Sequence, residues 1–157
     1  MNGGTDMEKI QKTADHLVER FGTTSPFELC DFLRIPVFMF DLPESVRGLS
    51  LQKVDGSPLI LLNQTLGEWE KRYCCAHELG HELLHKGLNA QAIADRTNLC
   101  VPRLEKEADY FAACLLIDPS LPEWSESYNP LTLQQIACLS GLPEKIVVLW
   151  HDSSGKK

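Results

Sequence analysis

The sequence lacks several features that would place it in other classes of protein. No apolar run approaches the roughly 20 residues that a membrane-spanning helix needs. The first residues, Met1 to Asp6, contain no basic stretch followed by an apolar one, so no secretion signal is expected. The formal net charge of −7 argues against a nucleic-acid-binding surface. A glycine-rich phosphate loop, a nucleophile elbow and an internal repeat are also missing. These absences predict a cytoplasmic protein that acts neither at a membrane nor directly on nucleic acid.

The six cysteines lack the spacing of a metal site, because none of them forms a C-x-x-C pair. In the cytoplasm thiols stay reduced, and in helix-like apolar patterns a free cysteine acts as a small core residue. Cys74 and Cys75 are adjacent and would point about 100° apart on a helix, so both cannot face one site. We therefore expect six reduced thiols, at Cys30, Cys74, Cys75, Cys100, Cys114 and Cys138.

The length of 157 residues and the hydrophobic content of 43% suffice for one folded domain with its own core. We expect this domain to span residues 1–151, with a pair of short helices at 131–150 and a disordered tail at 152–157. The helix pair resembles a helix-turn-helix. Its second helix carries Lys145 as its single basic residue, which is too little for phosphate binding, so packing is the favoured role.

The order of the other segments predicts an α+β fold, in which a small three-stranded sheet precedes a long helix. Helices are predicted from amphipathic patterns and from a serine that can begin a helix. Strands are predicted from segments rich in β-forming residues, and the turn from its turn-forming residues. Pro36 places the first strand at a sheet edge or begins it. A free edge of the sheet could receive an extended peptide as an added strand. In chain order the expected elements are helices at about 6–21 and 26–33, strands at 35–40, 48–54 and 59–62, a turn at 55–58, a helix at 66–86, a short helix at about 90–96, a helix at 104–115 and a loop at 118–130.

The most informative motif is His77-Glu78-Leu79-Gly80-His81, inside the longest expected helix. On a helix the two imidazoles, at i and i+4, lie on one face and can bind one metal ion. Glu78 lies beside them, where it could take a proton from water held by that metal. This is the H-E-x-x-H pattern of zinc hydrolases. The small residues Ala76 and Gly80 flank the histidines and would let another helix approach closely.

A second, overlapping H-E-x-x-H motif runs from His81 to His85. Both motifs cannot bind one zinc ion in the same way, because a tetrahedral catalytic site needs a third ligand from elsewhere and an open position. We prefer the first register, since small residues flank its histidines. His85 lies one turn later, near the expected helix end, and is interpreted as a neighbour or rim residue.

The third ligand is expected from the acidic helix at 104–115, whose apolar residues recur with a helical period. Glu105 and Asp109 are four residues apart and share a face. One of them could bind the metal while the other accepts the second N–H of a ligand histidine, which fixes the tautomer of the imidazole. Glu107 points roughly 160° from the midpoint of that pair and is the weaker candidate.

These two segments resemble the ImmA/IrrE family of metallopeptidases. The run from Arg72 to His85 is similar to the core motif of the family. The run from Glu105 to Pro119 is similar to its second motif, a glutamate, two residues, Ala-Asn or Ala-Asp, then Phe-Ala-Ala and a Leu-Leu-Met-Pro ending. The sequence departs from that ending at Ile117-Asp118, which concerns the packing of the helix end. The resemblance implies zinc ligands at His77, His81 and Glu105, and a catalytic Glu78. With Glu105 as the ligand, Asp109 is the member of the acidic pair that would make the outer contact to a histidine.

The resemblance further implies an α+β, mainly helical, zincin-like domain with an antiparallel or mixed three-stranded sheet. It implies a zinc-dependent endopeptidase that cleaves a helix-turn-helix transcriptional repressor in a phage, mobile-element or stress-response setting. Tyr73, Tyr110 and His151 are candidate donors to the oxyanion. The alternative is a metal-stabilised partner that binds a transcription regulator without cutting it. The presence of Glu78 favours the enzyme, because a structural zinc site usually has four ligands and needs no general base.

Overall fold

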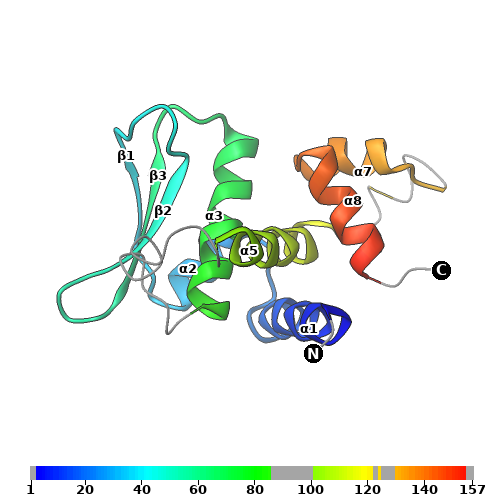
Figure 1. Ribbon diagram of the computed structural model, residues 1–157, viewed down its shortest axis with the longest axis horizontal. Coiled ribbons are helices and arrows are strands. Elements are labelled where there is room, and N and C mark those ends of the chain that lie inside the picture. The colour runs from blue at the N-terminus through cyan, green and yellow to red at the C-terminus, as the bar shows by residue number, and fades with distance from the viewer. Residues whose placement is uncertain (1–2, 86–100, 122–123, 125–129, 155–157) are drawn as a thin grey trace.

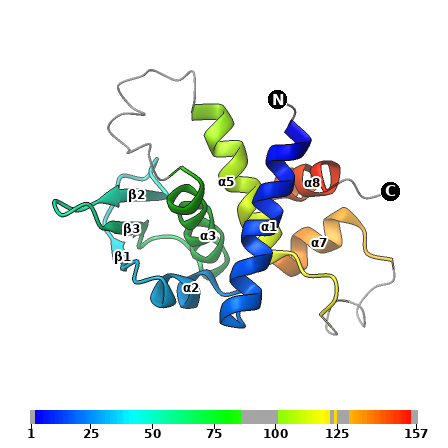
Figure 2. The ribbon, with the colours of Figure 1, turned by 90° about the horizontal axis from the view of Figure 1, so that it is seen from below.

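The computed structural model describes residues 3–85, 101–121, 124 and 130–154. A three-stranded sheet lies against one side of helix α3 (Glu68–Leu84), and helix α5 (Val101–Leu116) crosses α3 on its other side (Figure 1). Helix α2 (Pro26–Phe32) packs against α3. Seen from below, α1 (Gly3–Phe21) lies along α5 (Figure 2). The described part of the chain thus has the α+β architecture expected from the sequence, and none of its helices has the length and hydropathy of a membrane span.

The sheet is mixed, with strand order β1-β3-β2. Strand β1 (Val37–Phe40) runs parallel to the central strand β3 (Pro58–Asn63), and β2 (Gly48–Gln52) runs antiparallel to it. The two edge strands are therefore β1 and β2. This arrangement confirms the expected three-stranded sheet and the edge position of the strand that follows Pro36.

Local sequence signals set the ends of the helices. Helix α1 ends before Gly22, whose φ of 71° is easily adopted by glycine. Helix α2 begins after Ser25, whose Oγ accepts a hydrogen bond from the N–H of Glu28. The helices expected at 6–21, 26–33, 66–86 and 104–115 are confirmed to within three residues at each end. The short helix expected at about 90–96 lies outside the described residues.

The C-terminal pair consists of α7 (Leu133–Ser140) and α8 (Glu144–Ser153). Ile146, Val147 and Trp150 are buried and α8 packs on α5, in agreement with the expected packing role. Helix α8 is longer than expected, because the N–H of Ser154 still donates to the carbonyl of Trp150. The disordered tail expected from residue 152 is therefore wrong for residues 152 and 153, which belong to α8.

The crossing of α3 and α5 is close because small residues line it. A Cβ on Gly80 would lie 3.0 Å from Cδ1 of Phe111, which is nearer than ordinary carbon contacts allow. Ala76, Ala108 and Ala112 are fully buried. The close approach that Ala76 and Gly80 predicted is thus confirmed. It places the histidines of α3 directly opposite the acidic residues of α5.

The cysteines that the structure describes are free thiols. Four of them are buried, and Cys138 is exposed. The Sγ atoms of Cys30 and Cys75 lie 3.9 Å apart in the core, too far for a disulfide. Burial raises the pKa of the Cys74 thiol to about 11, which keeps it protonated. Cys100 lies outside the described residues.

Asn63, at the end of β3, ties the loop between β1 and β2 to the sheet. Its side chain is almost fully buried, and Nδ2 lies 2.9 to 3.2 Å from the carbonyl oxygens of Leu42, Pro43 and Val46. Its Oδ1 accepts hydrogen bonds from the N–H and the hydroxyl of Thr65. Asn63 therefore fixes the segment that leads into β2.

We expect Asn63→Asp to lower the free energy of unfolding by about 2–4 kcal/mol, because a buried carboxylate would face three carbonyl oxygens without a proton to donate. Urea denaturation followed by circular dichroism measures the change. Gln64→Ala, at the exposed neighbouring position, is the control and should change stability by less than about 0.5 kcal/mol. Equal stability of Asn63→Asp and the parent would show that the amide does not hold the loop.

Candidate metal centre

Two histidines of α3 and one glutamate of α5 converge on a single point. His77 Nε2 lies 3.0 Å from Glu105 Oε1, and His81 Nε2 lies 2.9 Å from Glu105 Oε2. One ligand atom from each of the three residues lies within 4.8 Å of the other two. Ligand atoms about 2.0 Å from a tetrahedral metal ion are roughly 3.3 Å apart. The spacing and the donor set, two imidazole nitrogens and a carboxylate, therefore fit an ion such as zinc.

Asp109 lies behind His77. Its Oδ1 is 2.8 Å from His77 Nδ1 and accepts a hydrogen bond of 2.6 Å from the hydroxyl of Tyr73. A proton held on Nδ1 directs Nε2 of His77 towards Glu105, so that Nε2 is available as a ligand atom once its own proton has left. Helical spacing left open which of Glu105 and Asp109 would meet the metal, and the resemblance to the metallopeptidase motifs implied Glu105. The geometry places Glu105 at the point of convergence and Asp109 one step further out.

Glu82 and His85, which belong to the second H-E-x-x-H motif alone, have other partners. His85 Nδ1 lies 3.0 Å from His81 Nδ1, and His85 Nε2 lies 2.8 Å from Glu107 Oε1. Glu82, which would be the base in the second register, is hydrogen-bonded to the hydroxyl of Ser50 on β2. By contrast Glu78 is buried and lines the same cavity as His77 and Glu105. The arrangement favours the first register.

Charge and burial act together on the converging side chains. Hydrogen bonds from His77 and His81 hold the pKa of Glu105 well below its usual range. Burial by itself lowers the pKa of His77, but the hydrogen bonds to Asp109 and Glu105 outweigh it and raise this pKa to about 10. The site therefore favours a positive charge, either a proton on His77 or a metal cation, and metal binding must release that proton.

Glu78 has a different environment. Burial raises the pKa of its carboxyl above the ordinary value, while His77 and His81 oppose that shift. A carboxyl group with a raised pKa is a better proton acceptor near neutral pH than an exposed one. Glu78 also lines a cavity of about 370 Å³ together with His77, so a substrate atom can reach it. These properties suit a general base.

One wall of this cavity comes from a segment that the sequence did not single out. It is residues 45–48, which lead into β2. A Cβ on Gly48 would lie 3.2 Å from the carbonyl oxygen of Leu61 and 3.4 Å from Cγ of Glu78. The lack of a side chain therefore lets the start of β2 approach Glu78. The one signal in the sequence is a glycine at the first position of an expected strand.

The three candidate oxyanion donors lie in different places. Tyr73 lines the cavity with His77 and Glu78, and burial raises the pKa of its hydroxyl well above the usual range, so it stays protonated. Tyr110 is buried with its hydroxyl 3.3 Å from Ser154 Oγ, towards α8. His151 lies on α8 beside Asp152, and α8 lies on the side of α5 away from the sheet (Figure 1). Of the three, the structure brings Tyr73 to the cavity.

Comparison with known proteins gives matches over most of the chain. The model of the peptidase M78 family, the IrrE N-terminal-like domain, matches residues 30–146. "Uncharacterized immunity region protein 2" of Bacillus phage phi105 is 32% identical over 144 residues, covering 89% of this chain and 87% of the relative. "Metallopeptidase ImmA" of Bacillus subtilis (strain 168) is 29% identical over 135 residues, covering 85% of this chain and 79% of the relative.

A solved structure, described as a Mycobacterium tuberculosis transcriptional regulator, shares the fold with a TM-score of 0.58 at 15% sequence identity. The match covers 90% of this chain and 54% of that chain, so this chain spans about half the length of the solved protein. At this level of identity the likeness concerns the fold alone.

We expect the purified protein to bind one zinc ion per chain through His77, His81 and Glu105. Alanine at any of these positions removes one of three protein ligands, so most of the metal should be lost after gel filtration. Elemental analysis by mass spectrometry measures the stoichiometry. His85→Ala should keep one equivalent when zinc is saturating.

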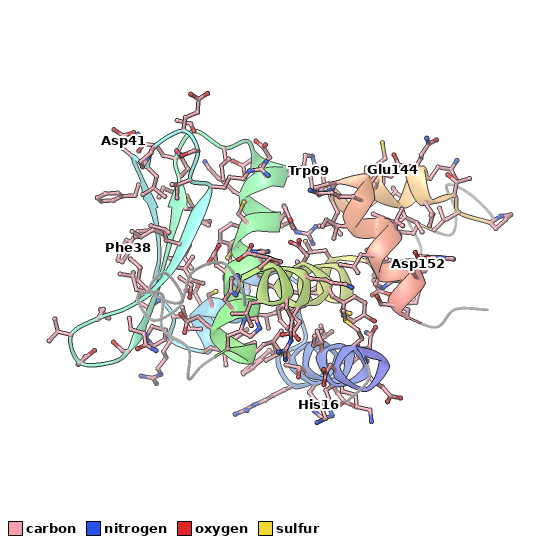
Figure 3. All side chains as sticks on the ribbon, in the orientation of Figure 1. His16, Phe38, Asp41, Trp69, Glu144 and Asp152 are labelled. Atoms are coloured by element: carbon pink, nitrogen blue, oxygen red, sulfur yellow. The ribbon has the colours of Figure 1, made fainter. Side chains whose placement is uncertain are left out.

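His16→Ala is the matched control, because His16 is an exposed histidine on α1 (Figure 3). It should bind zinc as the parent does. Full zinc in His77→Ala together with loss of zinc in His85→Ala would instead establish the second register.

Proposed function

Because the chain belongs to the ImmA/IrrE family of metallopeptidases, we propose that it is a zinc-dependent endopeptidase with its active site between α3 and α5. One observation carries the proposal. Two imidazole Nε2 atoms and one carboxylate converge next to the buried Glu78, in a cavity that is open to a substrate. This combination supports peptide hydrolysis better than a structural metal site, which would have no use for a free base.

In the proposed mechanism His77, His81 and Glu105 hold the metal. When bound, the ion supplies a Lewis acid that acidifies water and polarises a carbonyl group. Asp109 keeps the proton on Nδ1 of His77, so that Nε2 stays available. Glu78 accepts the proton of the attacking water on its carboxylate and then passes it to the nitrogen of the leaving amine.

Tyr73 is the candidate that we retain for stabilising the oxyanion. Its hydroxyl stays protonated and lines the cavity that contains Glu78. In the structure it donates to Asp109, so it must turn from that carboxylate to reach a substrate oxygen. A donor of this kind acts on the charge that develops in the transition state.

The edge strand β2 supports a path for the substrate. It pairs with β3 on one side, and its start at Gly48 approaches Glu78. An extended peptide added to the other side of β2 would pass the cavity with its carbonyl groups near His77 and Glu78. The exposed Phe38 lies on β1, at the opposite edge of the sheet from this path (Figure 3).

For the substrate we propose a transcriptional repressor with a helix-turn-helix domain. Two relatives, named as a phage immunity region protein and as Metallopeptidase ImmA, support this choice. The net charge of −7 would also favour the encounter with a basic DNA-binding protein, more strongly at low salt. Selectivity would come from docking on the folded partner.

The base is tested with Glu78→Gln, which keeps the size of the side chain and removes the proton acceptor. We expect this variant to retain zinc and the fold and to lose cleavage by a factor of at least about 10². The assay uses purified zinc-loaded protein and the repressor encoded beside it, with products identified by mass spectrometry. Glu82→Gln is the control and should cut at the rate of the parent. Equal cleavage by Glu78→Gln and the parent would contradict the assigned mechanism.

The partner is tested by capture on the Glu78→Gln protein, which should hold uncut substrate. We expect a helix-turn-helix repressor to be recovered from the native host, and the parent to cut that same protein in isolation. Weaker capture at high salt would reflect the opposite charges of the two proteins. Rapid digestion of casein by the parent, with no repressor captured, would point to a broad-specificity peptidase.

A further inference from the structure

His85 is a buried histidine that the proposed mechanism does not use. Its side chain is 5% exposed, and its backbone N–H donates to the carbonyl of His81 at the end of α3. Each of its two ring nitrogens lies near one polar atom. Nδ1 is 3.0 Å from Nδ1 of His81, and Nε2 is 2.8 Å from Oε1 of Glu107. His85 thus lies between a ligand histidine and a carboxylate of α5.

These contacts determine where the protons must be when His81 serves as a ligand through Nε2. The Nδ1 of His81 then carries a proton, and the atom it faces must accept a hydrogen bond. That atom is Nδ1 of His85, which must therefore be without a proton. A neutral His85 carries its proton on Nε2, where it donates to Glu107. This arrangement of protons satisfies each hydrogen bond from His81 through His85 to Glu107.

Glu107 fixes that arrangement from the far end. Its side chain is 13% exposed, and its Oε2 accepts a hydrogen bond of 3.2 Å from Nε of Arg103. The carboxylate is an acceptor only, so it selects the form of His85 with the proton on Nε2.

We propose that His85 and Glu107 are a positioning pair that holds His81 in its ligand tautomer and orientation, as Asp109 does for His77. The inference rests on the proposed metal site and adds the contacts from Glu107 through His85 to His81. In this arrangement α5 supplies three carboxylates with separate roles. Glu105 faces the metal, Asp109 supports one histidine, and Glu107 supports the other through His85.

The first test measures zinc affinity by competition with a chelator in matched pairs of variants. Glu107→Met removes the acceptor, whereas Glu107→Gln keeps a carbonyl oxygen that can accept from His85 Nε2. His85→Leu removes the acceptor for His81, whereas His85→Asn places an amide oxygen near the position of Nδ1. We expect affinity to fall about 10- to 100-fold in Glu107→Met and His85→Leu, and to be largely restored in the Gln and Asn variants.

Glu82→Gln controls for the loss of one nearby negative charge, since Glu82 contacts Ser50 and not this chain of contacts. Its affinity should fall less than that of Glu107→Met. Parent-like affinity in both Glu107→Met and His85→Leu would overturn the inference while leaving the metal site intact. Absence of zinc binding in the parent would overturn the metal site and the inference together.

The second test reads the protons directly, without an activity assay. Nitrogen-15 spectra of the histidine rings in the zinc-loaded parent should show His85 with a proton on Nε2 and none on Nδ1, and His81 with its proton on Nδ1. Glu107→Gln should keep this pattern, and Glu107→Met should lose it at His85. A parent in which His85 carries its proton on Nδ1, or on both nitrogens, would overturn the inference.

Discussion

The contact between Gly80 and the ring of Phe111 is the constraint on which the rest of the site depends. The proposed ligands come from two helices, and Glu105 lies 24 residues after His81 in the sequence, so their spacing is set by how closely α3 and α5 cross. With no side chain at Gly80, the ring of Phe111 lies where a Cβ would contact it. The resulting approach brings the carboxylate of Glu105 within 3.0 Å of both His77 and His81.

Once the two helices are at this distance, residues spaced one helical turn apart on α3 lie opposite residues spaced one turn apart on α5. Residues four apart on α3 and residues four apart on α5 each share a face, so successive turns of one helix meet successive turns of the other. His77 meets Asp109 and Glu105, and His81 meets Glu105. His85, the residue after α3, departs from this repeat and meets Glu107, which lies off the face that Glu105 and Asp109 share. The polar contacts are thus the edge of a helix crossing whose centre is made of small and aromatic residues. Since burial by the same crossing strengthens these contacts, packing and electrostatics support each other.

The local parts of this arrangement could be predicted from the sequence. Helical spacing alone places His77 and His81 on one face with Glu78 beside them, and turn and cap residues locate most helix ends. Helical spacing could not decide between Glu105 and Asp109, because both share the face and the choice depends on the axial offset of α5. The angular argument correctly kept Glu107 from the point of convergence. It gave no sign of the contact with His85, because His85 lies just beyond the end of α3.

Two features that depend on long-range contacts could not be predicted from the sequence. The wall formed by residues 45–48 arises because Asn63 binds the carbonyl groups of a loop about 20 residues earlier in the chain. Tyr110 adjoins Asp109 in sequence, yet its ring turns towards α8 because neighbouring residues on a helix point about 100° apart. Residue type alone therefore cannot show whether a candidate oxyanion donor points into the cavity. Its direction also depends on which further helix packs against it.

The central claim is that α3 and α5 bind one metal ion between His77, His81 and Glu105. Anomalous diffraction at the zinc absorption edge, from crystals of the zinc-loaded protein, tests it most directly. We expect a single strong peak per chain, about 2.0–2.2 Å from Nε2 of both histidines and from a carboxylate oxygen of Glu105. A peak bound by His81 and His85, or zinc-loaded crystals with no peak between the two helices, would contradict it.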